Sequence, residues 1–159
     1  MAWQCRRFSM IELVFVVGIL FIVLTMFLGT YTRSRERARR VACQGNLLKI
    51  GLSVRMYCDE FEEYLPLSTG RSFQPLSDED LLKAGAAYTC PSAFDASTDP
   101  ANSNFVYVGS GRKLSDPAPW TTSAAYDVSG NHPGNDWMNL LYLDGHVYGH
   151  EPGESGETN

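Results

Sequence analysis

The hydrophobic and polar positions of this chain predict a long N-terminal helix that begins in an apolar run. From Phe8 to Leu28, 21 residues include a single charged position, Glu12. As a helix rising about 1.5 Å per residue, the run measures about 31 Å, which matches the hydrocarbon thickness of a bilayer. We therefore expect residues 8–29 to form a transmembrane helix. Because a carboxylate costs about 2.5–3.5 kcal/mol at mid-bilayer, Glu12 should be paired or functional.

The next stretch, residues 30–64, is amphipathic rather than apolar. Residues 33–63 contain no proline, and apolar side chains recur at intervals of three and four, which is the period of a helix. These positions are Leu47, Ile50, Val54, Tyr57 and Phe61. The pattern predicts one helix of about 50 residues, with a membrane half and an amphipathic half. The acidic run over 59–63 opposes the dipole at the helix C-terminus and should turn or fray, and Pro66 ends the helix.

Residues 65–150 show shorter and more varied patterns, typical of a small α+β head. We expect a short helix capped by Ser77 and ending near Gly85. Strands are predicted at 105–108 and 125–128, the second of them at a sheet edge. A hairpin is predicted over 138–148, with Asp144-Gly145 as a two-residue type I′ turn. The tail, 151–159, is expected to be disordered. The predicted fold is therefore α+β, a long N-terminal helix whose second half packs on a small antiparallel sheet.

Charge is distributed unevenly along the chain. Residues 1–40 hold seven arginines against Glu12 and Glu36, a formal charge of +5. Since the whole chain carries −5, the remaining residues carry −10. Phosphates would be repelled by so acidic a domain, which excludes nucleic acid as the expected partner. The arginines after the apolar run suit either contact with anionic lipid head groups or simple solvation on the helix surface.

The cysteines, at positions 5, 43, 58 and 90, leave the disulfide pairing open. Cys43 and Cys58 lie about 22 Å apart on one predicted helix, too far for a bond. Cys90 can pair with either of them. No CxxC motif indicates a structural zinc site.

Candidate chemistry is sparse. Asp127, Asp136 and Asp144 are oxygen donors of the kind that calcium prefers, although Asp144 is equally explained as a turn residue. On a regular final strand, His146, Tyr148 and His150 would share a face, which suits either a metal site or solvated side chains. Ser110 lacks the G-x-S-x-G spacing of a nucleophile elbow, and no glycine-rich phosphate loop with its lysine is present. We therefore expect no enzyme, and no cofactor other than calcium.

Residues Arg7-Phe8-Ser9-Met10-Ile11-Glu12-Leu13 resemble the prepilin processing and methylation signal of type IV pilins and type II secretion pseudopilins. That family has a short basic leader, a cut before a Phe, and a Glu four residues after it. The resemblance implies a leader over residues 1–7, cleavage between Arg7 and Phe8, and methylation of the new amine. Glu12 of one subunit would then neutralise the amine of its neighbour. The family pattern has Gly before the cut, where this chain has Arg7.

A second resemblance, spread over the domain, is to the pilin-like proteins abundant in planctomycetes. That group is named for a His followed nine residues on by Asp-Gly; here eleven residues separate His132 from Asp144. Because Cys43 and Cys90 both fall in the resembling segments, the resemblance favours a bond between them. The segments are 40–51, 56–57, 64–66, 90–92, 131–134 and 143–147.

The resemblance implies a pilin or pseudopilin that assembles into an extracellular or periplasmic helical filament, for a type IV pilus or type II secretion. Its partners would be copies of itself or related pilins, a prepilin peptidase, the inner-membrane assembly machinery and, before assembly, the lipid bilayer. The chain would cross the inner membrane once, with the C-terminal domain facing outward. The expected assembly residues are Phe8, Glu12, Leu13, Val16, Val17 and Leu20.

The alternative is an uncleaved, membrane-anchored binding module on the cell surface or in the periplasm, with Trp120, Tyr126 and Trp137 as its contact residues. Arg7 favours this alternative. Five arginines follow the apolar run and two precede it, which by the positive-inside rule favours a cytoplasmic C-terminal domain, opposite to the orientation of a pilin. The apolar run is too long for a cleaved secretory signal peptide, and no Ala-x-Ala-like site follows it.

Overall fold

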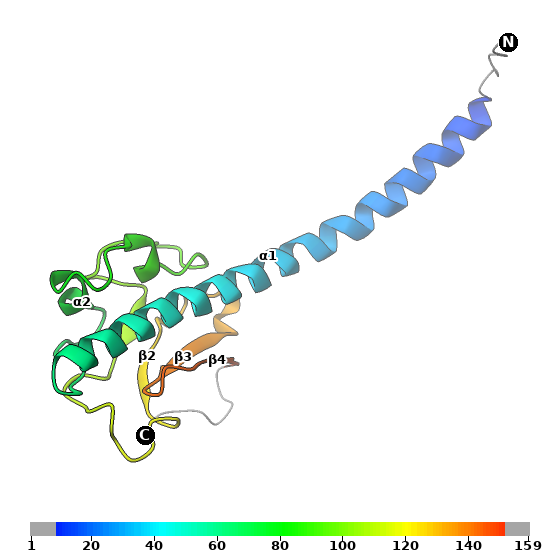
Figure 1. Ribbon diagram of the computed structural model, residues 1–159. Coiled ribbons are helices and arrows are strands. Elements are labelled where there is room, and N and C mark those ends of the chain that lie inside the picture. The colour runs from blue at the N-terminus through cyan, green and yellow to red at the C-terminus, as the bar shows by residue number, and fades with distance from the viewer. Residues whose placement is uncertain (1–8, 152–159) are drawn as a thin grey trace, which may run out of the picture. The chain divides into compact units, whose positions relative to one another are not determined.

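The computed structural model describes residues 9–151, except for the side chains of residues 27–30. The expected leader, the cut after Arg7, Phe8 and the tail from residue 152 lie outside the described residues. Eight helical and strand elements follow one another in the described range (Figure 1). In chain order they are α1 (Met10–Glu60), α2 (Gln74–Asp78), the 3₁₀ turn η1 (Gly85–Tyr88), β1 (Phe105–Tyr107), β2 (Ser123–Asp127), the 3₁₀ turn η2 (Pro133–Asn135), β3 (Met138–Tyr142) and β4 (Val147–His150).

Helix α1 is a single helix of 51 residues, which confirms the prediction of one helix through the apolar and amphipathic stretches. It ends at Glu60, before the predicted limit of residue 64, and the chain turns over the acidic run. Glu62 and Glu63 there have positive φ values of 53° and 66°. The chain divides after Arg37 into two compact units, which are described separately.

The second unit contains the sheet, whose order is β1-β2-β3-β4 with all neighbours antiparallel. The register pairs Val106 with Tyr126, Tyr126 with Leu140, and Leu140 with Tyr148. The prediction that residues 125–128 form an edge strand is therefore wrong, because β2 lies between β1 and β3. Small side chains, Ala124 and Ala125, allow β2 to be buried in the middle of the sheet.

The predicted hairpin is confirmed as β3 and β4, but its turn differs from the prediction. The amide N–H of Tyr142 donates to the carbonyl of His146, and that of Gly145 donates to the carbonyl of Tyr142. Gly145 has a φ of 92°, whereas Asp144 is not in the positive-φ region. This is a three-residue loop with glycine in the left-handed position, not a two-residue type I′ turn.

The prediction of a helix beginning at Ser77 is also wrong. Helix α2 begins earlier, at Gln74, because Pro75 is well suited to the first turn of a helix. It ends at Asp78. Asp80 then has a positive φ of 65°, which stops the helix. Residues 85–88 form the 3₁₀ turn η1, and Thr89 after it is extended.

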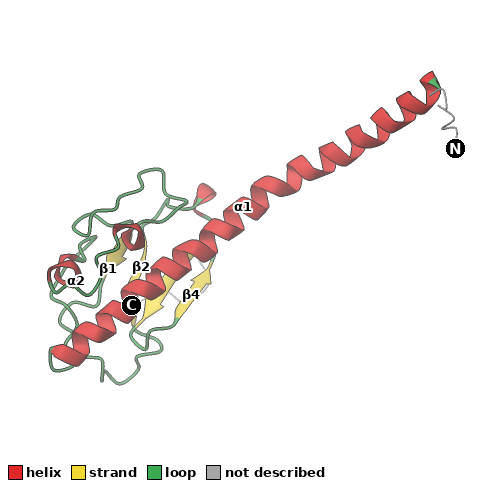
Figure 2. Cartoon of the chain, turned by 45° about the horizontal axis from the view of Figure 1, so that its top comes forward, coloured by secondary structure: helices red, strands yellow, loops and turns green. Residues whose placement is uncertain are grey.

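The core of the second unit lies between the C-terminal part of α1 and one face of the sheet (Figures 1 and 2). Gly51 permits a close approach, since a Cβ there would lie 2.7 Å from a methyl carbon of Leu141. The fully buried helix side chains recur every three or four residues. They are Cys43, Leu47, Ile50, Val54 and Cys58. The α+β prediction is thus confirmed at the level of a long helix on a four-stranded antiparallel sheet.

Candidate functional site

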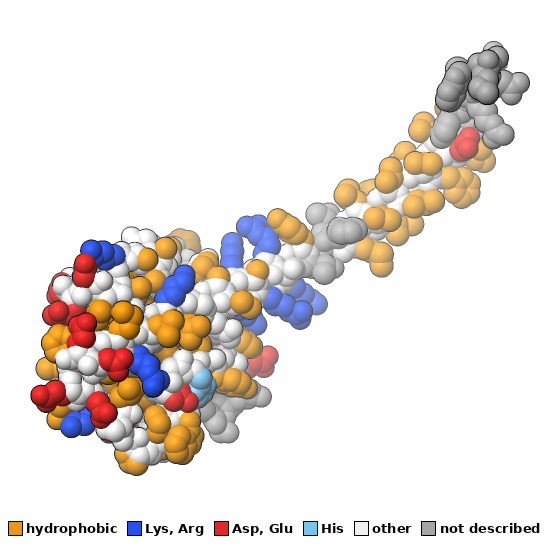
Figure 3. All heavy atoms as spheres, viewed as in Figure 1, with side chains coloured by type: hydrophobic (Ala, Val, Ile, Leu, Met, Phe, Trp, Pro, Cys, Tyr) orange, Lys and Arg blue, Asp and Glu red, His pale blue; other side chains and the backbone are white. Residues whose placement is uncertain are grey.

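The first unit presents an apolar helical surface. Leu13, Val16, Val17 and Leu20 follow one helix face, at spacings of three and four residues, and are 44–62% exposed. Neighbouring apolar side chains on the other faces, such as Val14 and Phe15, are exposed as well. Figure 3 shows hydrophobic side chains along this part of the helix. A helix that is apolar all round is normally buried in a membrane or in a large protein core.

Among residues 9–151, α1 is the one helix that is long and apolar enough to cross a membrane. That property suits a membrane anchor or a signal sequence equally. Glu12 is the acid in its first turn, where the helix dipole favours negative charge. Its proposed partner, the amine of Phe8, lies outside the described residues.

Exposed arginines follow the apolar surface within the first unit. Arg33, Arg35 and Arg37 are all exposed. The guanidinium of Arg35 lies 5.5 Å from the ring centroid of Tyr31, a cation–π contact one turn away. The helix therefore changes from an apolar to a basic surface along its length.

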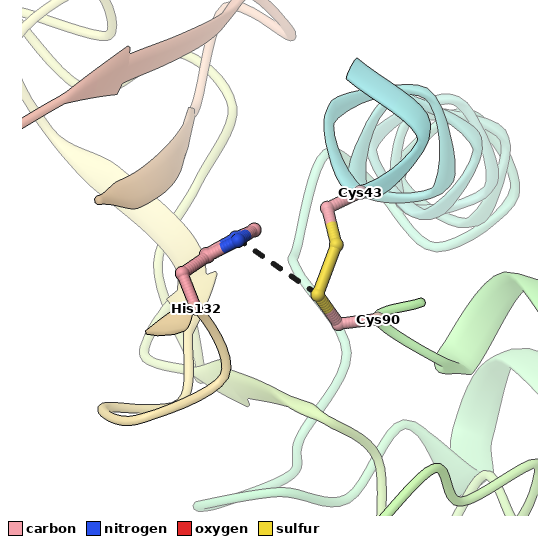
Figure 4. Close-up of side chains that lie close together, drawn as sticks. All are labelled: Cys43, Cys90 and His132. Atoms are coloured by element: carbon pink, nitrogen blue, oxygen red, sulfur yellow. Dashed lines mark hydrogen bonds between the residues drawn. A yellow bond between two sulfur atoms is a disulfide. The ribbon is translucent and has the colours of Figure 1, made fainter. Parts of the chain in front are cut away.

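In the second unit, a disulfide joins Cys43 of α1 to Cys90, just after η1 (Figure 4). This is the pair favoured by the resemblance. Cys58 is a free, buried thiol. Burial, helped by the carboxylate of Asp59, raises the pKa of the Cys58 thiol to about 11, so at neutral pH it stays protonated and unreactive.

A buried polar network lies beside the disulfide. Asp127, at the end of β2, accepts at Oδ2 from the backbone N–H of Asn139 over 3.1 Å and from its side-chain amide over 2.7 Å. The same oxygen lies 3.1 Å from Nε2 of His132, which lies 3.9 Å from Sγ of Cys90 (Figure 4). All three polar side chains are at most 2% exposed. Each partner of the carboxylate thus comes from a different segment of the second half of the chain.

Sequence reasoning missed this network. The register pairs Tyr126 with Leu140, which places Asp127 and Asn139 opposite each other on adjacent strands. The available signal was a polar residue in each of two otherwise apolar strands. Without the pairing of those strands, that signal does not connect the two residues.

The structure does not bring the predicted calcium ligands together. Asp127 binds His132 and Asn139, Asp136 accepts from Arg40, and Asp144 accepts from the backbone N–H of His146. Within residues 9–151, the one group of three potential metal-ligating side chains with converging atoms is Cys43, Cys90 and His132.

The predicted histidine face is assembled in part, because the rings of Tyr148 and His150 in β4 stack with their centroids 6.2 Å apart. His146 precedes β4, stacks on Tyr142 at a centroid distance of 4.3 Å, and contacts Asp144. His150 is buried, and Tyr148 is exposed. In the described part of the chain, His146 and His150 belong to no converging ligand group.

Of the three proposed contact aromatics, Trp120 is the most exposed, at 63%. Tyr126 is half-buried in β2. Trp137 packs under Arg40, and its indole N–H donates to Asn139 Oδ1 over 3.0 Å. The three therefore do not act as a single exposed surface.

Comparison with known proteins adds no assignment: no protein-family model, no curated protein and no solved structure matches this chain.

Proposed function

We propose that this chain is a structural subunit, a pilin or pseudopilin, that assembles through its apolar N-terminal helix into a helical filament. The observation that carries the proposal is the apolar surface of residues 10–26, exposed on every face and containing one acid, Glu12, in its first turn. Exposed apolar surface of this extent marks an interaction site. A bilayer covers it before assembly, and neighbouring helices cover it in a filament.

Burial of this apolar surface is favourable both in a bilayer and in a filament, compared with exposure to water. Burying one Leu, Ile, Val or Phe side chain contributes about 1.5–3 kcal/mol, and this segment holds more than ten of them. In a bilayer, Glu12 is an unfavourable exception, since lipid offers no counter-charge. In a filament, an amine at the start of a neighbouring helix offsets that cost, because a buried acid is tolerated when it is paired.

The proposed assembly begins with cleavage between Arg7 and Phe8 by a prepilin peptidase, followed by methylation of the new amine. Leu13, Val16, Val17 and Leu20 then pack between helices in the filament core. The domain from residue 38 onward faces outward from the inner membrane, and the filament is extracellular or periplasmic. A type IV pilus and a type II secretion pseudopilus use the same helix packing.

Replacement of Glu12 by Ala tests this proposal. The variant should insert into membranes as well as the wild type does, because it loses a charge from the apolar segment. It should fail to form filaments, since the neighbour's amine loses its partner. The matched control, Glu36→Ala, removes an acid from the same helix beyond the apolar segment and should assemble normally. Filaments formed at wild-type levels by Glu12→Ala would contradict the proposal.

An uncleaved, membrane-anchored binding module is the second candidate. Three observations favour it: the position before the expected cut is Arg7 rather than Gly, more arginines follow the apolar run than precede it, and Trp120 is 63% exposed. N-terminal mass spectrometry of membrane-extracted protein separates the two functions. N-methylated Phe8 supports the filament subunit, whereas an intact terminus at Met1 or Ala2 supports the anchored module.

A further inference from the structure

We propose that reduction of the Cys43–Cys90 disulfide creates a buried zinc site formed by Cys43, Cys90 and His132, with Asp127 beside it. This site is independent of the proposed function of the N-terminal helix. In the disulfide form, the two Sγ atoms and the ligating nitrogen of His132 all lie within 4.8 Å of one another, and the three residues are buried (Figure 4). The fold thus gathers three zinc-type ligands at one point.

The geometry requires only small movements. Zinc binds sulfur at about 2.3 Å and nitrogen at about 2.0–2.1 Å, which places the ligand atoms of a tetrahedral site about 3.4–3.8 Å apart. Cys90 Sγ and His132 Nε2 are already 3.9 Å apart. Breaking the S–S bond lets the two sulfurs separate towards the same spacing, so His132 needs no rearrangement of the backbone.

Asp127 lies next to these three ligands, outside the group of converging atoms. Its Oδ2 lies 3.1 Å from His132 Nε2. Its Oδ1 is buried and has no hydrogen-bond partner among the described residues, which is an unfavourable state for a carboxylate oxygen. A movement of the carboxylate towards the three ligands would let this oxygen complete the zinc site. The two hydrogen bonds from Asn139 fix the carboxylate, as outer partners commonly fix metal ligands.

The chemistry balances with a dithiol as the reductant. The dithiol gives two electrons and two protons to the Cys43–Cys90 bond and becomes a disulfide itself. Zinc then displaces both thiol protons, because thiolates are the metal-binding form of cysteine. His132 binds through Nε2 as the neutral imidazole, with its proton on Nδ1. The oxidised protein lacks both thiolates, so zinc binding depends on the redox state.

Cobalt titration of the full-length protein in detergent tests this site, since tetrahedral thiolate–cobalt complexes have characteristic absorption bands. After reduction with a phosphine, the wild type should bind a single Co²⁺ per chain, and Zn²⁺ should displace it. The oxidised protein should show no such bands. Cys58→Ser, which removes the other described cysteine, is the matched control and should bind like the wild type.

Single substitutions of the proposed ligands test which residues bind the metal. Cys43→Ser and Cys90→Ser should lose the thiolate bands or show them much weakened, and His132→Gln should reduce the affinity at least about tenfold. Absence of the bands in the reduced wild type overturns the proposal, whether or not that protein stays folded. Equal binding by Cys43→Ser or His132→Gln, or loss of binding in Cys58→Ser, also overturns it.

Discussion

The guanidinium of Arg40 donates from one nitrogen to both carboxylate oxygens of Asp136, over 2.9 Å each. The two residues are 96 positions apart, so this pair joins α1 to the segment that leads into β3. The same guanidinium lies 4.9 Å from the ring centroid of Trp137, whose indole binds Asn139. A continuous series of contacts therefore runs from the helix surface to the buried carboxylate of Asp127.

We expect the loss of Arg40 to lower the free energy of unfolding by more than the loss of its charge partner, Asp136. Asp136→Ala should lower the free energy of unfolding by up to about 1 kcal/mol, because Asp136 is half exposed and water screens the pair. Arg40→Ala should cost more, since the cation–π contact with Trp137 is lost as well. Urea denaturation of both variants measures the difference. Equal costs would show that the ring contact contributes nothing.

Asn139 should be among the most sensitive positions in the sheet. Asn139→Ala removes a side-chain hydrogen bond from the buried Asp127 carboxylate and exchanges a buried amide for a cavity. Loss of a hydrogen bond to a charged group costs about 1.5–3 kcal/mol. Asn102→Ala, at an exposed loop position, is the control and should change stability by less than about 0.5 kcal/mol. A similar small effect at Asn139 would mean that the Asp127 network is not maintained in solution.

The disulfide should stabilise the second unit mainly by restricting its unfolded state. Cys43 and Cys90 are 47 positions apart, a loop length for which the chain-entropy estimate is about 4 kcal/mol. Cys90→Ala should therefore lower the thermal unfolding temperature substantially in metal-free buffer. Adding a reductant to the wild type should have an effect of similar size. If reductant leaves the unfolding temperature of the wild type unchanged, the disulfide does not form in solution.

Two glycine substitutions should have opposite effects. Gly145 has a φ of 92° in the β3–β4 loop, so Gly145→Ala forces a strained backbone and should destabilise the protein by about 1 kcal/mol or more. Gly45 lies within α1, and an added Cβ there meets nothing within 4 Å. Gly45→Ala should stabilise by about 0.5–1 kcal/mol. Denaturation midpoints that move in the same direction for both variants would contradict the assigned backbone conformations.

Stability should fall at alkaline pH in part because of Cys58. Burial raises the pKa of its thiol from 9.0 to about 11, so the folded state holds the proton more tightly than the unfolded state does. This contribution is fully present below pH 9 and is lost as the pH rises through 11. Burial also raises the pKa of Tyr88, to about 12. Unfolding measured from pH 8 to 11 should be less pH-dependent in Cys58→Ala than in the wild type, and an equal dependence would refute the buried thiol.

The sequence was sufficient where a strong period was present. The stripe from Leu47 to Phe61 predicted the amphipathic part of α1, and the Asp144-Gly145 pair predicted the last hairpin. The turn type was missed because Asp144 takes an ordinary backbone conformation and accepts the N–H of His146. The position of α2 was missed because Pro75 is a stronger start signal than Ser77. The Asp127 network depends on strand pairing, which no local pattern contains.

Cryo-electron microscopy of filaments sheared from cells that express this protein tests whether the N-terminal helix builds a filament core. We expect a helical filament whose core consists of residues 8–29 packed against copies of themselves, with Glu12 beside the N-terminal amine of a neighbouring Phe8. Recovery of the protein only in the membrane, as a monomer with residues 1–7 attached and no filament, would contradict the proposed filament function.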